Sequence, residues 1–476
     1  MGEYDDVGVQ LAGGESATTH LHEALLAAVA EYPDVLGDAG VPDEPAAFKS
    51  SYPEVLPRFE ARRVDSDRRS AIARSIVSAS DAAMVVEPGG LLLAEAVRQP
   101  GDPFELHHAA PGGSSRLIPR VPFAGTTVSG AELVAEVSAM VGRGSASSPV
   151  LDAVSWLVDA AGADGIDLSG RRIAMFGAGA ELAPTRLWLE GGAEVLWIDV
   201  AEPPADLLGA TDLSGSLHWV EGGSDLLTEP HRVRATIEQF AGDGEIDLGL
   251  YAYAPGRARE WRLTATMNAI VDALPTGTVR GTAMLLSPTT CGVLSFDDLA
   301  RESERRASRP RWQSTLDSLR VFGRGGGHVT YGSTSTNRGI VSIQGGSYQA
   351  AQYIGKILAA EVWSTGEPPI AVSANTAGVS LTESLQHPVF DIAFAGARSL
   401  DVETFEPATT AALNGLLTLH DRSNPARADR PLAELFDTRV HGGVYVAPYP
   451  IDPALRVAAA IGILKDPRRV GALIRR

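Results

Sequence analysis

Two glycines and one aspartate have the types and the spacing to hold a dinucleotide. Gly177 and Gly179 follow a short apolar run, and Asp199 stands 22 residues after Gly177, at the end of a second apolar run. Backbone N–H groups in a glycine turn that leads into a helix attract phosphate, because the helix N-terminus carries a positive partial charge. A carboxylate after the second strand accepts hydrogen bonds from a ribose and repels a 2′-phosphate. These residues therefore predict a site for NAD(H) rather than NADP(H).

Those three residues need a strand, a turn, a helix and a second strand to position them. The pattern predicts strands over 171–176 and 194–200, with a helix over 182–190 between them. Further strands are expected over 217–220, 246–254, 369–378 and 440–449. Strands that alternate with helices are typical of a parallel sheet covered on both faces. We therefore expect an α/β fold with a Rossmann-type doubly wound parallel sheet.

Glu181 stands where the pyrophosphate of a dinucleotide would meet the helix. A third small residue is usual there, whereas this chain has Glu181 and Leu182. The carboxylate would repel phosphate and compete with it for the same amides. The alternative is a helix whose first turn uses Glu181 to satisfy its own amide donors and binds no nucleotide.

Length and composition describe a globular protein. The 476 residues are 44% hydrophobic and 21% charged, and the length suggests two or three domains, of which we expect two. The net charge of −19 disfavours nucleic acid and anionic membranes as partners. Cys291 is the only cysteine, which fits a reducing compartment. No apolar run is long enough to span a bilayer, and we expect a cytoplasmic protein.

The first 168 residues show helical patterning between loops rich in proline and glycine, and no motif in them indicates a role. We expect a mainly helical N-terminal domain over 1–168 and the sheet domain over 169–476. Two histidine pairs, His20 with His22 and His107 with His108, lie in the N-terminal part. Neither pair shows acidic or cysteine neighbours at a spacing that suggests metal ligation, so we expect no metal.

The order of segments across about 171–452 resembles the short-chain dehydrogenase/reductase family. In that family a glycine turn, an acidic residue, an Asp-hydrophobic pair and a small-residue turn follow the first four strands. The matching residues here are Gly177 with Gly179, Asp199, Asp225 with Leu226, and Ala254 to Gly256. The family's turn is G-x-x-x-G-x-G, of which only Gly177 is in register. The resemblance implies that these residues bind the cofactor.

The family's catalytic group is a serine, a tyrosine about 13 residues later and a lysine one helical turn after the tyrosine. The tyrosine gives or takes the substrate's proton, the serine orients the substrate oxygen, and the lysine lowers the pKa of the tyrosine. By this resemblance Ser335 and Tyr348 are the serine and the tyrosine. Gln352 stands where the lysine is expected, and Lys356, eight residues after Tyr348, could reach back along one helix face.

Ser287 is the alternative serine. The segment 282–295 could itself be the fifth strand, with Ser287 at its end and 297–327 as an inserted helical segment. Tyr348 follows Ser335 at the family's spacing, and for that reason we prefer Ser335.

The resemblance implies further roles around this group. Asn268 would be the family's helix asparagine that holds a proton-relay water, while Gly378 and Thr382 would contact the nicotinamide. The helix over 348–363 carries apolar residues, and the family commonly pairs this element across a two-fold axis, so we expect a homodimer or tetramer. The apolar residues are Ile354, Ile357 and Leu358.

Three functions remain open from the sequence. The first is an NAD-dependent oxidoreductase that acts on a carbonyl, hydroxyl or enoyl group of a small organic substrate. The second is a short-chain-dehydrogenase fold that has lost its redox chemistry and serves as a binding or assembly component, which Glu181 and Gln352 favour. The third is non-redox acid/base chemistry such as dehydration. The substrate itself does not follow from the sequence, because pocket loops vary freely on such scaffolds.

Overall fold

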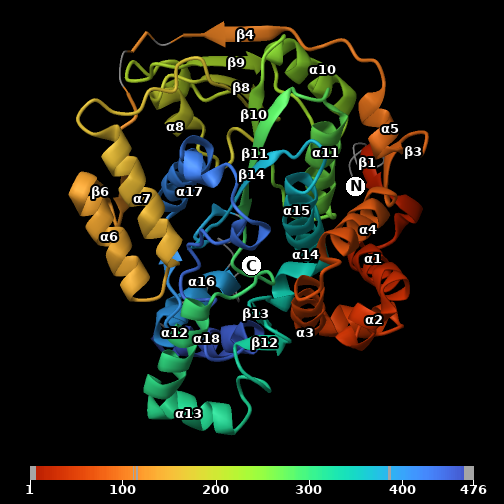
Figure 1. Cartoon of the computed structure of the whole chain (residues 1–476), viewed down its shortest axis with the longest axis vertical. Helices are drawn as coiled ribbons and strands as arrows, with labels where there is room; N and C mark the ends of the chain where they lie inside the picture. The colour runs from red at the N-terminus through yellow and green to blue at the C-terminus, as the bar shows by residue number, and fades with distance from the viewer. Residues whose placement is uncertain (1–6, 111, 114–115, 384–387, 466–476) are drawn as a thin grey trace.

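A single seven-stranded sheet runs through the centre of the molecule, with helices on both faces (Figure 1). The computed structural model describes residues 7–110, 112–113, 116–383 and 388–465. The strands lie in the order β14–β11–β10–β7–β8–β9–β4. Their bounds are β7 Arg172–Phe176, β8 Glu194–Ile198, β9 Ser216–Val220, β10 Ile246–Leu250, β11 Val279–Leu286, β14 Ala371–Thr376 and β4 Leu106–Ala109.

The strand order reverses at β7 and β10. All neighbouring strands are parallel except β4, which pairs antiparallel with β9 at one edge. In chain order the six parallel strands run 3-2-1-4-5-6 across the sheet. The connections leave in opposite directions after β7 and β10, and ligands bind where the order reverses in this way. The fold is α/β, with a mostly parallel sheet that is compatible with a Rossmann-like fold.

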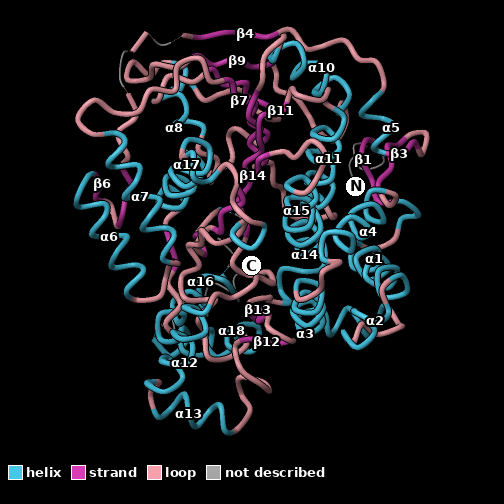
Figure 2. The backbone as a smooth tube through the Cα atoms, viewed as in Figure 1, coloured by secondary structure: helices cyan, strands magenta, loops and turns pink. Residues whose placement is uncertain are grey.

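Two layers of helices cover the sheet because its strands are apolar on both faces. Along β7, Ala174 and Phe176 face one core, whereas Ile173 and Met175 face the other. In Figure 2 the first face is covered by α10 Pro230–Ala241, α11 Arg259–Ala273, and a long helix formed by α14 Gly345–Gln352, the π-helical turn η4 Tyr353–Leu358 and α15 Ala359–Ser364. The second face is covered by α7 Ser148–Ala161, α8 Thr185–Glu190 and α17 Pro407–Ser423.

The N-terminal residues share the core of the sheet. Four N-terminal helices pack on α11 and on the long helix, in one continuous apolar cluster with β7 and β10: α1 Ala17–Glu31, α3 Pro45–Val64, α4 Arg69–Asp81 and α5 Leu93–Arg98. On the other face α6 Gly130–Gly142 packs on α7, and β4 adds an edge strand to the sheet. The division into two domains at residue 168 stays a prediction, since the structure shows no break between two cores there.

The remaining N-terminal elements are mostly short. The α-helix α2 spans Pro33–Leu36. The strands are β1 Gly8–Leu11, β2 Met84–Glu87, β3 Leu91–Leu92, β5 Arg120–Phe123 and β6 Thr126–Ser129.

A separate lobe follows the carboxyl ends of β11 and β14, at the bottom of Figure 1. Between β11 and α14 the chain inserts α12 Phe296–Ser308, α13 Arg311–Ser318 and the hairpin β12 His328–Tyr331 with β13 Thr334–Asn337. After β14 come β15 Val379–Ser380, α16 Pro388–Ala397, β16 Thr404–Phe405 and, near the end, α18 Ile451–Lys465. A short helix, α9 Ala205–Leu208, connects β8 to β9.

Three sequence expectations about elements need correction. The strand expected over 440–449 does not form: only Arg439 and Val440 make bridges, and the glycines that follow have positive φ of 60° and 92° at Gly442 and Gly443. The strand expected over 246–254 ends at Leu250. The helix expected from residue 182 begins at Thr185, after Pro184. Within the described residues no helix combines the length and the apolarity that crossing a membrane requires.

Candidate functional site

The glycine turn after β7 is pressed against the end of β10. Gly177 has φ of +69°, a conformation that favours glycine. A Cβ at this position would lie 2.5 Å from the backbone of Ala252, the second residue after β10. Any side chain would therefore push the first strand-end loop away from the fourth. The turn and the end of β10 thus form one surface at the carboxyl edge of the sheet.

Asp199 lies against the same turn. The amide of Gly179 donates to Oδ2 of Asp199 at 2.9 Å. The side chain is half-buried, just past the end of β8. The structure therefore brings together Gly177, Gly179 and Asp199, which the sequence places 22 residues apart.

The amides of this turn are largely bonded within the protein. Gly177 N–H donates to Ile198 O at 2.8 Å, and Ala180 N–H donates to Gly177 O at 3.0 Å. Helix α8 begins only at Thr185, whose hydroxyl donates to Ala178 O at 2.6 Å. A pyrophosphate would find its usual donors occupied. The turn offers a dinucleotide a ribose acceptor at Asp199, and it offers phosphate the Gly179 amide only after that amide leaves Asp199.

Glu181 links the turn to the segment that follows β15. Its Oε2 accepts the backbone N–H of Glu383 at 2.9 Å, so Thr382 lies next to a residue that contacts the turn. Helix α8 has no side-chain cap, and its N-cap residue is Pro184. The alternative from the sequence expects Glu181 to cap its own helix, and the structure shows that it does not. Its carboxylate still places negative charge beside the turn, which opposes phosphate.

Three of the other expected cofactor residues have local structural roles. The Asp225 carboxylate accepts Leu227 N–H at 2.8 Å, and Leu226 is 4% exposed inside the core. The loop is also covered by β1, where Val9 N–H donates to Leu227 O at 2.8 Å. A Cβ on Gly378 would lie 2.2 Å from the ring of Phe405, so close packing alone requires a glycine there.

Tyr348 lies at the carboxyl end of β11, next to Ser287 and Thr289, whose hydroxyls act to lower its pKa. The hydroxyls of Ser287 and Thr289 are 2.8 Å apart, and the Thr289 hydroxyl donates to Gln344 Oε1 at 2.8 Å. Burial raises the pKa of Tyr348, while these hydroxyls oppose the rise and the Glu260 charge adds to it. A tyrosine in this setting keeps its proton at neutral pH.

Ser335, the serine that we preferred from the sequence, lies elsewhere. It is 5% exposed in β13, and its hydroxyl pairs with that of Thr330 at 2.8 Å. The serine beside Tyr348 is Ser287, the alternative. The spacing of 13 residues misleads because the insertion separates Ser287 from Tyr348 by 61 positions, and the chain then returns to the end of β11. Ser-Pro directly after an apolar strand was the signal that pointed to Ser287.

Gln352 and Lys356 both turn toward β11. Gln352 Oε1 accepts the backbone N–H of Ser287 at 2.9 Å, so it holds the loop that carries the serine. Lys356 Nζ donates to Leu285 O at 2.7 Å, and burial lowers its pKa to about 8. The ammonium is therefore bound by the strand backbone. We expected the Lys356 ammonium to reach the hydroxyl of Tyr348, but its hydrogen bond goes to Leu285 O instead.

Asn268 holds the π-helical turn. Its side-chain amide donates to Gly355 O at 2.8 Å, one residue before Lys356. The Oδ1 atom of Asn268 is buried and has no hydrogen-bond partner in the described part of the chain. A buried acceptor without a partner commonly marks an ordered water or a functional group. The structure thus places Asn268 next to the residue that precedes Lys356, while the water that the resemblance implies for it stays a prediction.

The sequence did not predict a role for Glu260. It lies in the first turn of α11, is 9% exposed, and accepts from Ser347 Oγ at 3.0 Å and from Gly256 N at 3.2 Å. Gly256 begins three consecutive residues with positive φ, and this tight turn leads into α11. The ring of Tyr253 meets that of Tyr348 edge-on at 6.4 Å. The turn after β10 and Tyr348 are far apart in the sequence, and the tertiary structure brings them into contact.

A second polar cluster lies outside this edge of the sheet. Among the described residues, the group of histidine, cysteine and carboxylate side chains close enough to hold a metal ion consists of Glu15, His20 and Glu23. The sequence expectation that His20 has no suitable acidic neighbours was wrong. Glu23 follows it by one helical turn, and Glu15 folds back from the preceding loop.

Two comparisons of the sequence with known proteins identify no relative. No protein-family profile matches the chain, and no curated protein is significantly similar to it in sequence. The function must therefore be inferred from the geometry described above.

Proposed function

We propose that the protein is an NAD(H)-dependent oxidoreductase of the short-chain dehydrogenase/reductase type, acting on a carbonyl, hydroxyl or enoyl group of a small organic substrate. The observation that carries the proposal is the contact between Ser287 and Tyr348, residues 61 positions apart. Both lie at the carboxyl edge of the sheet, where ligands bind in folds with this strand order.

A continuous series of contacts links this pair to the glycine turn. Gly177 packs on Ala252, the next residue is Tyr253, and the ring of Tyr253 contacts that of Tyr348. A dinucleotide with its ribose at Asp199 would cross the end of β7 toward β10, which is the direction of Tyr348. NAD(H) would supply or accept the hydride there.

The residues of the chain itself would handle the proton. The pKa of Tyr348 is raised by burial, so at neutral pH its hydroxyl carries a proton and can donate it to a substrate oxygen. Ser287 and Thr289 would orient that oxygen, and Gln352 fixes the backbone of Ser287. Because no lysine lowers the pKa of the tyrosine, these residues favour reduction of a carbonyl over oxidation of an alcohol at neutral pH.

The N-terminal helices cover the surface of the long helix on which a partner subunit was expected to pack. Ile354, Ile357 and Leu358, the residues expected at a subunit interface, are 2%, 5% and 0% exposed. Helices α1 and α4 of the same chain pack on α14, η4 and α15. The chain itself already covers these three residues, and we propose that its N-terminal residues replace the partner subunit there.

A specific observation favours a second function. Glu181 keeps a carboxylate at the turn, the Gly179 amide is bonded to Asp199, and Gln352 occupies the family's lysine position. Each feature weakens either phosphate binding or tyrosine activation. The second candidate is a redox-inactive member of the fold that acts as a binding or assembly component.

Titration with NADH separates the two candidates. The oxidoreductase should bind NADH, which raises its melting temperature in proportion to the logarithm of the ligand concentration above Kd. With a panel of aldehydes, ketones and enoyl thioesters it should oxidise NADH, and Tyr348→Phe should lower the rate by about 10²-fold or more without loss of NADH binding. Absence of any shift with NADH or NADPH would refute the oxidoreductase and leave the binding component.

A further inference from the structure

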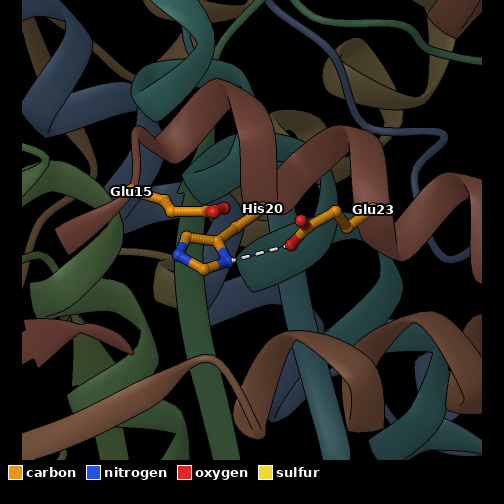
Figure 3. Close-up of side chains that lie close together, drawn as sticks. All are labelled: Glu15, His20 and Glu23. Atoms are coloured by element: carbon orange, nitrogen blue, oxygen red, sulfur yellow. Dashed lines mark ion pairs between the residues drawn. The ribbon is translucent and has the colours of Figure 1, made fainter. Parts of the chain in front are cut away.

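The start of helix α1 gathers one imidazole and two carboxylates, as Figure 3 shows. Glu15 lies just before the N-cap Ser16, and His20 and Glu23 are three residues apart on one face of the helix. One nitrogen of His20 and one oxygen of each glutamate lie within 4.8 Å of one another. Both glutamates are exposed, whereas the His20 side chain is only 10% exposed.

The orientation of His20 places two hydrogen-bond acceptors, one on His20 and one on Glu23, next to each other. Its Nε2 lies 3.1 Å from Ala12 O, and because a carbonyl can only accept, Nε2 carries a proton. A neutral ring then presents the lone pair of Nδ1 to Glu23 Oε2, which also only accepts. Two such acceptors remain together only if a positive charge, either a proton or a metal ion, lies between them.

The distance between the two acceptors favours the metal ion. Nδ1 of His20 and Oε2 of Glu23 are 3.3 Å apart. A charge-assisted N–H···O bond usually measures about 2.7–2.9 Å, which is clearly shorter. Ligands at about 2.0–2.1 Å in a tetrahedron around zinc are separated by about 3.3–3.4 Å, which agrees with the observed spacing. The ring is also held through Nε2 by a backbone carbonyl, the usual support of a metal-binding histidine.

We propose that Glu15, His20 and Glu23 bind one divalent transition-metal ion of the zinc class. One imidazole nitrogen and two carboxylate oxygens suit zinc, while magnesium and calcium prefer oxygen ligands alone. Three protein ligands leave a fourth position for water.

The ion would fix the start of α1 against the helices that carry the candidate site. The His20 ring meets Trp261 of α11 at 6.4 Å, edge to face. Two residues before His20, Thr18 lies so close to α14 that a Cβ on Gly346 would come within 2.2 Å of its hydroxyl. Gly346 is two residues before Tyr348. The metal would therefore stabilise the packing behind the tyrosine without touching it.

The test uses the full chain, stripped with a chelator and dialysed against zinc. Elemental analysis should find one zinc per chain, and zinc should raise the melting temperature of the stripped protein. The double variant Glu15→Gln/Glu23→Gln changes two exposed side chains, so it should fold, and it should bind zinc at least about tenfold more weakly. His20→Gln should do the same. Magnesium should neither raise the melting temperature nor compete with zinc.

His107→Gln provides the matched control. His107 is 46% exposed and also pairs with a glutamate, Glu221, but has no third ligand. This variant should bind zinc like the unchanged protein. Equal zinc binding by the unchanged protein and the double variant would overturn the proposal, as would no zinc binding at all. So would nitrogen NMR at pH 7 in the presence of zinc that shows both His20 nitrogens protonated. None of these results bears on NADH binding, which is measured separately.

Discussion

Asp199 accepts a hydrogen bond from the amide of Gly179 at 2.9 Å, so the end of β8 is tied directly to the glycine turn after β7. The same carboxylate would have to bind a ribose in the proposed enzyme. In the proposed enzyme, dinucleotide binding and the conformation of the turn would therefore be coupled through one side chain.

Replacing Asp199 with alanine should weaken NADH binding by about ten- to a hundredfold, because hydrogen bonds to a charged group contribute about 1.5–3 kcal/mol. The preference for NADH over NADPH should shrink at the same time, since the repulsion of the 2′-phosphate is lost. Fluorescence titration with both nucleotides measures the two effects. Asp206→Ala, an exposed aspartate in α9, is the control. Equal affinity of both variants for NADH would contradict the role of Asp199.

Ser287→Ala and Ser335→Ala distinguish the two candidate serines. We expect the first to lower turnover by about 10²-fold, because Ser287 contacts Tyr348. The second should leave turnover unchanged and lower stability by about 1 kcal/mol, because Ser335 only pairs with Thr330. Steady-state kinetics and urea unfolding provide the two measurements. A larger loss of turnover in Ser335→Ala than in Ser287→Ala would instead support Ser335 as the catalytic serine, as the 13-residue spacing to Tyr348 predicts.

Acid should destabilise the protein in part through His441. Burial and the nearby Arg439 charge lower its pKa from the ordinary 6.5 to about 3. Between these values the unfolded chain binds a proton that the folded chain does not, so stability falls as pH falls from about 6.5 toward about 3. Urea unfolding at pH 7 and pH 5 should show a smaller loss in His441→Asn than in the unchanged protein. An equal loss of unfolding free energy in both proteins would exclude His441 as a cause of the acid destabilisation. The control is His107→Asn, at an exposed position, which should behave like the unchanged protein.

The ion pair between Arg63 and Glu361 should be essential to the packing of α3 on α15. Both side chains are 0% exposed, the pair is 3.0 Å apart, and Arg69 also contacts Glu361 at 2.9 Å. Glu361→Gln leaves buried cations with less compensation and should cost about 3–5 kcal/mol of unfolding free energy. Asp34→Asn breaks the exposed pair with Arg68 and should cost at most about 1 kcal/mol. Comparable losses of unfolding free energy in Glu361→Gln and Asp34→Asn would mean that burial does not make the Arg63–Glu361 pair more important than an exposed pair.

The long helix α14–η4–α15 should not form a subunit interface. Because its apolar residues are already buried by the chain's own helices, we expect light scattering after size exclusion to give the mass of one chain, 49.9 kDa. A dimer whose chemical cross-links map to residues 345–364 would contradict this prediction.

The sequence by itself determined most of the parallel sheet and the glycine turn. Apolar runs of the right length specify β7, β8, β9, β10 and β14 within a few residues, since strands buried on both faces must be apolar throughout. Gly177 and Asp199 could be placed together because one strand, one helix and one loop separate them. Local spacing is informative over such short distances.

Only the tertiary structure decided which polar side chains meet. Ser287 rather than Ser335 reaches Tyr348 because an insertion between β11 and α14 folds away as a lobe, and sequence spacing does not show where such an insertion returns. The engagement of Gly179 by Asp199 and the turn of Lys356 toward Leu285 depend on side-chain directions at a crowded strand edge. The burial of the long helix depends on residues 7–98, whose patterning shows that they are largely helical but not what they cover. Apolar periodicity determines which face of an element is buried, whereas its partner is chosen by packing over the whole chain.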